Sequence, residues 1–303
     1  MLKKSTTPSK CFDKFPVLVS YAYARTRAGR AVFDSLVKDD LVDVLLDCGA
    51  FTVYNSGGEI KLDDYLRFVD DYKDNLYGYM SLDVVGNPKA TDVNLREAIK
   101  QGFKPMPVHV IGDGKQRMDE LFELSDCVAL GGMYRNQELR MARRYVLTYI
   151  KEKMRWAAGR PVHWFGVTRK DLLPTFRPAS IDSTTWANGS LYGQLCVYVG
   201  NGRWVTAYNY AKRRAVACNS QAMKRCLTVS EDFAQGINLK IAWGGATSPV
   251  NDITTDSWVR FSCDVYQWFG TRVFLSTVPN TASTDPLVNA IHRNKHRLLK
   301  GAT

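Results

Sequence analysis

Three aspartates occupy the same kind of place in the sequence, at the end of an apolar run and just before the chain turns. Asp47 follows VLL, Asp83 follows MSL and Asp182 follows ASI. If these runs are parallel strands, their carboxyl ends meet at one mouth of the sheet, where barrel enzymes carry catalytic groups from several strands. We therefore expect the three carboxylates to face one cavity.

Two carboxylates on one substrate suit chemistry at an anomeric carbon, because one can attack or shield C1′ while the other moves a proton. For any single aspartate the alternative is an Asx turn or a helix N-cap. Glycines near the ends of these and neighbouring runs, Gly49, Gly86 and the Gly131-Gly132 pair, favour a site.

The elements that must position these groups recur as apolar runs of strand length, each followed by a segment of helical period. The seven predicted strands cover residues 16–22, 42–47, 78–83, 105–111, 127–131, 162–167 and 179–182. The pattern predicts an α/β fold, a (β/α)8 TIM-like barrel. It disfavours an open doubly wound sheet, because no glycine-rich dinucleotide turn follows the first strand.

After residue 191 the pattern changes. Two runs of strand character, 191–199 and 204–208, flank Gly200-Asn201-Gly202, which predicts a β-hairpin. We expect a single domain over residues 1–303 with a β-rich, basic and aromatic insertion or subdomain after the seventh strand, at about 187–285. A closing helix is predicted over residues 287–299.

The net charge of +11, from 41 Lys and Arg against 30 Asp and Glu, is unevenly placed. Residues 184–230 contain no acidic residue, and six cations lie there among tryptophans and tyrosines: Arg203, Lys212, Arg213, Arg214, Lys224 and Arg225. Cations that neutralise phosphates, interleaved with rings that stack on bases, indicate a nucleic-acid-binding surface. The alternative is a solvated basic face with the aromatic residues in the core. For the basic stretch 292–300 two roles remain open, binding of backbone phosphate and a contribution to solubility alone.

Seven cysteines form an odd, scattered set with no CxxC or CxC pair, and none is spaced with a histidine as zinc ligands usually are. We expect reduced thiols and no bound metal. No apolar run approaches the roughly 18–20 residues that span a bilayer, and the N-terminus lacks the apolar stretch of a secretory signal. We expect a cytoplasmic protein without a membrane partner.

Five segments, taken in order, resemble the tRNA-guanine transglycosylase superfamily, and most of all its phage branch, the DpdA-type DNA 7-deazaguanine transglycosylases. They are LLDCGAFT, SLDVVG, LGGM, HWFGVT and IDSTTW, within about Val42 to Val199. The resemblance implies a role for each matched residue: Asp47 transfers protons, Phe51 stacks on the base, Asp83 reads the guanine edge, Gly131 and Gly132 donate backbone N–H groups to the purine carbonyl, Phe165 closes the other face of the base, and Asp182 is the nucleophile. His109, in PVHVIG, falls near the family's glutamine that contacts the purine carbonyl.

The chain departs from the family pattern in three ways. Cys48, Ala50 and Thr52 replace small or amide residues of the first motif, so we expect the base selectivity to differ from the family's. The family's four-ligand zinc motif is missing after Asp182. The residues by which the tRNA enzymes read the anticodon loop have no counterpart in TTWANGS, and this loss favours DNA over tRNA.

The expected function is therefore an enzyme, a pentosyltransferase that exchanges guanine in DNA for a 7-deazaguanine such as preQ0 through a covalent aspartyl-glycosyl intermediate. The resemblance implies DNA with a flipped or single-stranded nucleotide and the free deazaguanine as partners, without a cofactor or zinc. The alternatives are a tRNA-guanine transglycosylase without the zinc subdomain and a non-catalytic barrel that binds nucleic acid.

Overall fold

The computed structural model describes residues 12–131, 143–166, 169–187, 194–208, 249–277 and 285–299. The chain divides into two compact units. One comprises Pro16–Ser183 and Phe269–Thr277, and the other comprises Met1–Phe15, Thr184–Trp268 and Val278–Thr303. The first of these, here called the barrel unit, carries all three strand-end aspartates.

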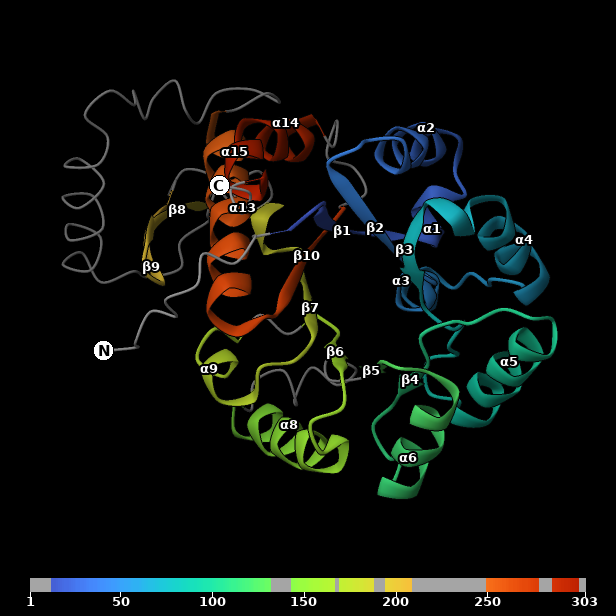
Figure 1. Cartoon of the computed structure of the whole chain (residues 1–303). Helices are drawn as coiled ribbons and strands as arrows, with labels where there is room; N and C mark the ends of the chain where they lie inside the picture. Colours follow the sequence, from blue (N-terminus) through green and yellow to red (C-terminus); the bar gives the residue numbers. More distant parts are fainter. Residues whose placement is uncertain are drawn as a thin grey trace. The chain divides into compact units, whose positions relative to one another are not determined.

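The barrel unit is built on a curled, eight-stranded parallel sheet (Figure 1). The strands are β1 (Phe15–Ser20), β2 (Val42–Asp47), β3 (Leu76–Tyr79), β4 (Val108–His109), β5 (Val128–Leu130), β6 (Val162–Trp164), β7 (Ser180–Ser183) and β10 (Arg272–Ser276). Their order in the sheet is β3-β2-β1-β10-β7-β6-β5-β4, and a parallel bridge between Met80 and Met106 links the end of β3 to the segment before β4. Neighbours in the sheet thus follow the chain order, with β10 between β7 and β1. The predicted α/β class with a parallel sheet is confirmed, and the curled sheet is consistent with a (β/α)8-like fold.

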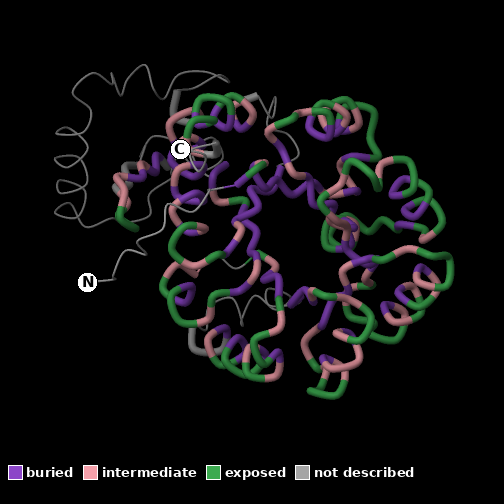
Figure 2. Tube along the Cα trace, viewed as in Figure 1, coloured by how far each residue is buried: buried purple, intermediate pink, exposed green. Residues whose placement is uncertain are grey.

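Helices follow the strands and cover the outside of the sheet, with their outer sides exposed (Figure 2). They are α1 (Tyr21–Ala24), α2 (Arg27–Val37), α3 (Ala50–Ser56), α4 (Leu62–Tyr72), the 3₁₀ turn η1 (Lys73–Asn75), α5 (Pro88–Lys100), α6 (Lys115–Leu124), α8 (Arg143–Ala157) and α9 (Leu173–Phe176). Local sequence explains several starts. The Thr26 hydroxyl accepts a hydrogen bond from the Gly29 N–H at the start of α2, and Asn87 accepts one from Ala90 at the start of α5, where Pro88 is the first residue.

The interior of the barrel is an apolar layer with one residue from each of six strand segments. It contains Leu18, Leu45, Met80, Val108, Ala129 and Phe274, with Phe165 packed against it. Side chains alternate along a strand, so the residues two positions further on also face inward, one layer nearer the carboxyl ends. In β2 that residue is Asp47, and in β10 it is Ser276. The alternation of the core residues therefore brings polar groups to the mouth.

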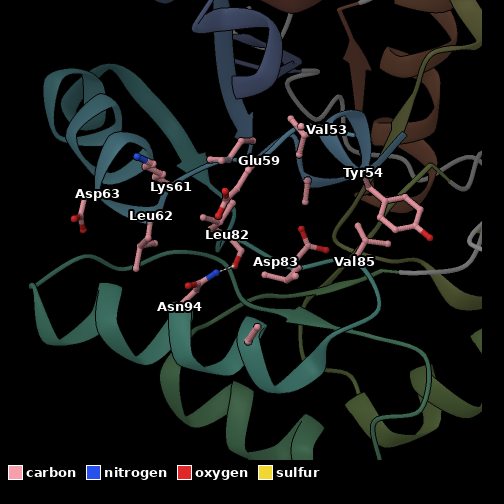
Figure 3. A pocket seen from close by; sticks show the side chains of 15 residues that line it. Val53, Tyr54, Glu59, Lys61, Leu62, Asp63, Leu82, Asp83, Val85 and Asn94 are labelled. Carbon is pink, nitrogen blue, oxygen red and sulfur yellow. Dashed lines mark hydrogen bonds between the residues drawn. The ribbon is translucent and has the colours of Figure 1, made fainter. Parts of the chain in front are cut away.

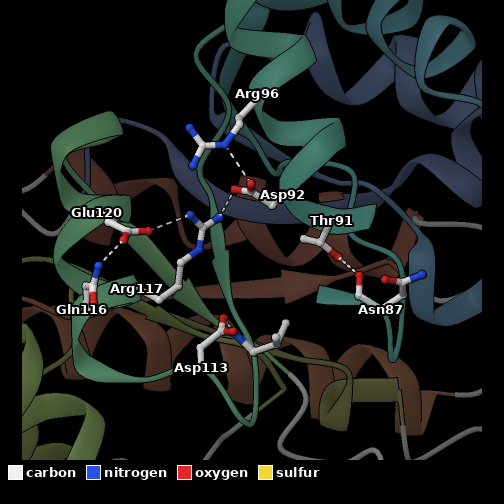
Figure 4. A network of polar contacts seen from close by, with 9 residues as sticks. Asn87, Thr91, Asp92, Arg96, Asp113, Gln116, Arg117 and Glu120 are labelled. Carbon is white, nitrogen blue, oxygen red and sulfur yellow. Dashed lines mark hydrogen bonds and ion pairs between the residues drawn. The ribbon is translucent and has the colours of Figure 1, made fainter. Parts of the chain in front are cut away.

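A polar network joins the helices on either side of β4 (Figure 4). Arg117 of α6 lies 2.5 Å from Asp92 of α5 and 3.2 Å from Glu120, and Asp92 also binds Arg96 at 2.7 Å. Asp113 accepts a hydrogen bond from the Val110 N–H at 3.0 Å and closes the turn after β4. These contacts fix the start of α6 relative to the strand.

The second unit contains a hairpin and three helices among the described residues. The hairpin pairs β8 (Gln194–Gly200) with β9 (Arg203–Tyr208) in antiparallel register, which confirms the predicted turn at Gly200-Asn201-Gly202. The helices are α13 (Pro249–Phe269), α14 (Asp285–Arg293) and α15 (Lys295–Leu299), and a 3₁₀ turn, η2, covers Thr185–Ala187. That this region is an insertion in the barrel stays a prediction.

The aromatic residues of the hairpin pack inward. The rings of Tyr198 and Trp204 are 5.2 Å apart and both lie against Phe261 of α13, while Trp204 also contacts Trp258. Tyr198 is buried and donates its hydroxyl to Asp264. These two rings therefore belong to a core within this unit. For Tyr198 and Trp204 this agrees with the alternative interpretation, in which the aromatic residues pack in the core and do not stack on bases.

Candidate functional site

The three aspartates lie at the carboxyl ends of β2, β3 and β7, and the charges of Asp83 and Asp182 are both close enough to affect Asp47. Asp47 is the last residue of β2, Asp83 follows β3, and Asp182 lies in β7 in register with Phe274 of the interior. Asp182 is buried, and the other two are partly buried. The structure therefore brings together the three carboxylates that the sequence predicts for one site.

Asp47 has the most perturbed acidity of the three. Burial raises its pKa most, the neighbouring carboxylate of Asp83 raises it further, and Asp182 adds to the effect. The Gly49 N–H donates to Asp47 Oδ2 at 3.1 Å and partly opposes this shift. The net effect raises the pKa of Asp47 to about 7. A carboxyl with this pKa can both give and accept a proton at neutral pH.

The turn after β2 requires glycine at position 49. Gly49 has φ +80°, a left-handed conformation, and it is the N-cap residue directly before α3. A Cβ atom there would lie 2.7 Å from both the Cβ and the backbone nitrogen of Ala22. In this left-handed turn the Gly49 N–H donates to the Asp47 carboxylate.

Asp83 is held by a cysteine. Cys48 Sγ donates to Asp83 Oδ1 at 3.1 Å, and burial, followed by the charge of Asp83, raises the pKa of the Cys48 thiol well above its usual value. The thiol therefore stays protonated and acts as a donor. Burial raises the pKa of Asp83 as well, although the Cys48 hydrogen bond lowers it in part.

Asp182 is fixed by donors from two other strands. The Gly166 N–H, after β6, donates to Asp182 Oδ1 at 2.5 Å, and the Ser276 hydroxyl of β10 donates to Oδ2 at 3.2 Å. His163 Nε2 of β6 lies 3.5 Å from Oδ1. The carboxylate is thus held in one orientation at the mouth.

Phe165 and Gly131 share one side of the mouth. Phe165 is partly buried over the interior layer, and a Cβ atom on Gly131 would lie 4.0 Å from its ring and 2.7 Å from Val108 Cγ1. The Gly131 N–H already donates to the His109 carbonyl at 3.0 Å within the sheet, so it is not the free donor that the resemblance implies. Gly132 lies outside the described residues.

His109 is directed away from the aspartates. Its neighbour Val108 belongs to the interior layer, so alternation turns His109 toward the helices. There, Nε2 lies 3.2 Å from the Gly114 carbonyl and the ring contacts Trp156 of α8. Burial lowers the pKa of His109. The structure places this predicted base-binding residue outside the aspartate cluster.

A pocket of about 540 Å³ opens beside Asp83, between the segment that carries α3 and the loop after β3 (Figure 3). Its polar lining includes Tyr54, Glu59, Lys61, Asp63, Asp83 and Asn94, and its apolar lining includes Val53, Leu82 and Val85. The Asn94 amide donates to the Leu82 carbonyl at 3.2 Å and supports the floor. Phe51, the predicted stacking residue, lies in α3 and is 50% exposed, as is Tyr54 at 55%. Exposed rings thus stand on the helix that follows Asp47.

Of the six cations predicted to bind nucleic acid, the structure describes one. Arg203 is exposed at the start of β9, directly after the hairpin turn. Lys212, Arg213, Arg214, Lys224 and Arg225 lie outside the described residues.

Among the described residues, no group of three or more His, Cys, Asp or Glu side chains is arranged to hold a metal ion. None of the helices there has the length and apolar composition of a membrane span.

Sequence reasoning missed Ser276 as a partner of Asp182. Ser276 lies in β10, whose RVFLS segment is an apolar run of strand length that could have been recognised. No protein-family model, curated protein or solved structure matches the chain.

Proposed function

We propose that the mouth of the barrel exchanges guanine in DNA for a free 7-deazaguanine, by two displacements at C1′. The observation that carries the proposal is the pairing of two carboxyl groups with different surroundings at one mouth. Asp182 is held by backbone and hydroxyl donors, whereas the pKa of Asp47 is raised to about 7. One group suits nucleophilic attack and the other suits proton transfer.

In the first displacement, an Asp182 oxygen attacks C1′ of a nucleotide flipped out of the helix, and the C1′–N9 bond breaks. The bonding pair leaves with guanine N9, which takes a proton from the Asp47 carboxyl. The products are free guanine, an Asp182 glycosyl ester and an ionised Asp47. The phosphodiester backbone stays intact.

In the second displacement, the 7-deazaguanine occupies the vacated space and Asp47 removes the proton from its N9. N9 then attacks C1′ and releases the Asp182 carboxylate, so the configuration at C1′ is retained overall. Asp47 is protonated again, ready for another cycle. No electron is gained or lost, and both steps use groups of this chain and its two substrates.

Several contacts support the binding part of the proposal. Phe165 lies over the interior layer beside Gly131, where no side chain fits, so a flat base would meet an apolar wall there. Asp83 presents a third carboxylate, which suits the N1 and exocyclic amino donors of guanine. Phe51 stands exposed on α3 as a stacking residue. Arg203 and the cations of residues 212–225 would follow the DNA backbone.

The experiment compares wild-type protein with Asp182→Ala and with Asp119→Asn as a control. Asp119 lies on α6, where it pairs with Lys115 and Arg160 outside the mouth. Labelled guanine is incubated with each protein and either DNA or tRNA, and incorporated label is measured together with gel-shift affinity. We expect exchange into DNA by the wild type and Asp119→Asn. In Asp182→Ala we expect exchange below a few per cent, with affinity changed by only a few fold.

Exchange into tRNA alone would favour the zinc-free tRNA enzyme. Binding to DNA without exchange by the wild type would favour the non-catalytic barrel. Full exchange by Asp182→Ala would remove Asp182 from the nucleophile role.

A further inference from the structure

His163 lies inside the barrel with its two ring nitrogens facing different groups of β7. The residue is fully buried, and its ring makes T-shaped contacts with the rings of Phe165 and Phe274, at centroid distances of 5.0 and 6.1 Å. Nδ1 lies 2.8 Å from the Ser180 hydroxyl, and Nε2 lies 3.5 Å from Asp182 Oδ1. Nε2 has no hydrogen-bond partner within ordinary distance among the described residues, and the Asp182 carboxylate lies just beyond that distance.

These contacts decide which nitrogen carries the proton in the neutral ring. A hydroxyl can donate or accept, but an ionised carboxylate only accepts. A proton on Nδ1 would turn the Nε2 lone pair toward Asp182, which is repulsive. A proton on Nε2 lets the ring donate to Asp182 while Ser180 donates to Nδ1. The distance of 3.5 Å is longer than an ordinary N–H···O bond, as is common for catalytic hydrogen bonds without substrate.

We propose that His163 is a positioning residue for Asp182, in the chain Ser180 O–H to His163 Nδ1 and His163 Nε2–H to Asp182 Oδ1. The inference rests on the proposed function, because it assigns the two oxygens of the nucleophile. Gly166 and His163 hold Oδ1, which leaves Oδ2, beside the Ser276 hydroxyl, to reach C1′. When the second displacement returns negative charge to the carboxylate, the Nε2–H bond strengthens and stabilises the leaving group.

The first test does not depend on catalysis. Full-length protein labelled with ¹⁵N-histidine is compared with His163→Gln, which identifies the His163 signals by their loss. In the neutral His163 ring we expect Nε2 to be protonated and Nδ1 unprotonated, and we expect Asp182→Ala and Ser180→Ala each to shift this tautomer toward a mixture. A wild-type ring protonated on Nδ1, or one indifferent to Asp182→Ala, would overturn the inference.

The second test measures base exchange by His163→Phe, His163→Gln and Trp164→Phe. Trp164 is the next residue of β6, buried on the opposite side against Phe176, so its substitution controls for packing on the same strand. We expect His163→Phe to lower kcat about 10- to 100-fold with KM within about threefold, because the lost contact acts mainly after binding. His163→Gln, which keeps an N–H donor, should recover part of kcat, and Trp164→Phe should stay near wild type.

Equal loss in all three variants would show a packing role and overturn the inference. If His163→Phe does not fold, His163→Gln and the tautomer measurement still decide. If the wild type exchanges no base but shows the expected tautomer and its dependence on Asp182, the proposed function fails while the contact stands.

Discussion

Replacing Asp47 by asparagine tests the electrostatics of the mouth without any substrate. The pKa of Asp47 is raised to about 7 in the folded protein, from 3.8 in the unfolded chain. The folded state therefore holds the proton more tightly. The stability from this group is fully present below pH 4 or so and is lost as the pH rises through about 7.

The size of the effect follows from the difference between the two pKa values. At about 1.36 kcal/mol per pKa unit, a shift of roughly three units lowers the free energy of unfolding of the wild type by up to about 4 kcal/mol between pH 4 and pH 8. Asparagine cannot ionise, and its oxygen can still accept the Gly49 N–H. Asp47→Asn should therefore have nearly wild-type stability at pH 4 and gain up to about 4 kcal/mol over wild type at pH 8.

The assay is urea unfolding of both proteins at several pH values from 4 to 8, with the difference between the two taken at each pH. Asp119→Asn is a control of opposite sign. Hydrogen bonds from Lys115 and Arg160 lower the pKa of Asp119, so this variant should gain nothing as the pH rises. A constant difference between Asp47→Asn and wild type over this range would refute the argument that burial and Asp83 perturb Asp47.

Three further predictions concern the neighbours of Asp47 and the basic segment. Asp83→Asn should lower the pKa of Asp47, because Asp83 is the main charge that raises it, and the pH profile of base exchange should shift accordingly. The same variant should bind guanine about 5- to 150-fold more weakly, because an unpaired buried polar group costs ~1–3 kcal/mol. Unchanged guanine affinity would contradict the base-reading role of Asp83. Gly49→Ala should lose about 2–4 kcal/mol of stability through backbone strain and overpacking, against about 1 kcal/mol for the control Gly57→Ala. Gly57 also has a positive φ, +71°, but a Cβ atom there would meet open space. Equal losses of stability in thermal unfolding would therefore rule out the steric contact between residue 49 and Ala22. Neutralising Arg213, Arg214, Lys224 and Arg225 together should flatten the plot of log K against log salt by up to ~3–4 units, and an unchanged slope would place the DNA elsewhere.

Much of the barrel could be predicted because its strands are short apolar runs bounded by turns. The carboxyl end of such a run is visible in the sequence, so Asp47, Asp83 and Asp182 could be assigned to one mouth. The eighth strand was missed although RVFLS is a similar run. Between β7 and this strand lie the basic, aromatic residues 184–230 and the helix α13. This long interval interrupts the repeat of strand and helix that made the other strands recognisable. Ser276 of β10 was therefore missed as a partner of Asp182.

Other details depend on which side of a strand a residue faces, and very short strands do not show this in sequence. β4 is only Val108–His109, and the packing of Val108 in the interior decides that His109 faces outward. In β6, which covers Val162–Trp164, the alternation of side chains places His163 on the inner side of the sheet. Composition likewise could not separate base-stacking rings from core rings, and Tyr198 and Trp204 belong to a core because α13 packs on them.

The most direct measurement of the central claim is the search for the covalent intermediate. Wild-type protein is incubated with a guanine-containing oligodeoxynucleotide, denatured during turnover and separated under denaturing conditions, and the retained species is digested for peptide mass analysis. The account predicts a protein–DNA adduct whose deoxyribose is attached to the peptide that contains Asp182, and no adduct in Asp182→Ala. An adduct on another residue, or base exchange by the wild type with no adduct under any quench time, would contradict it.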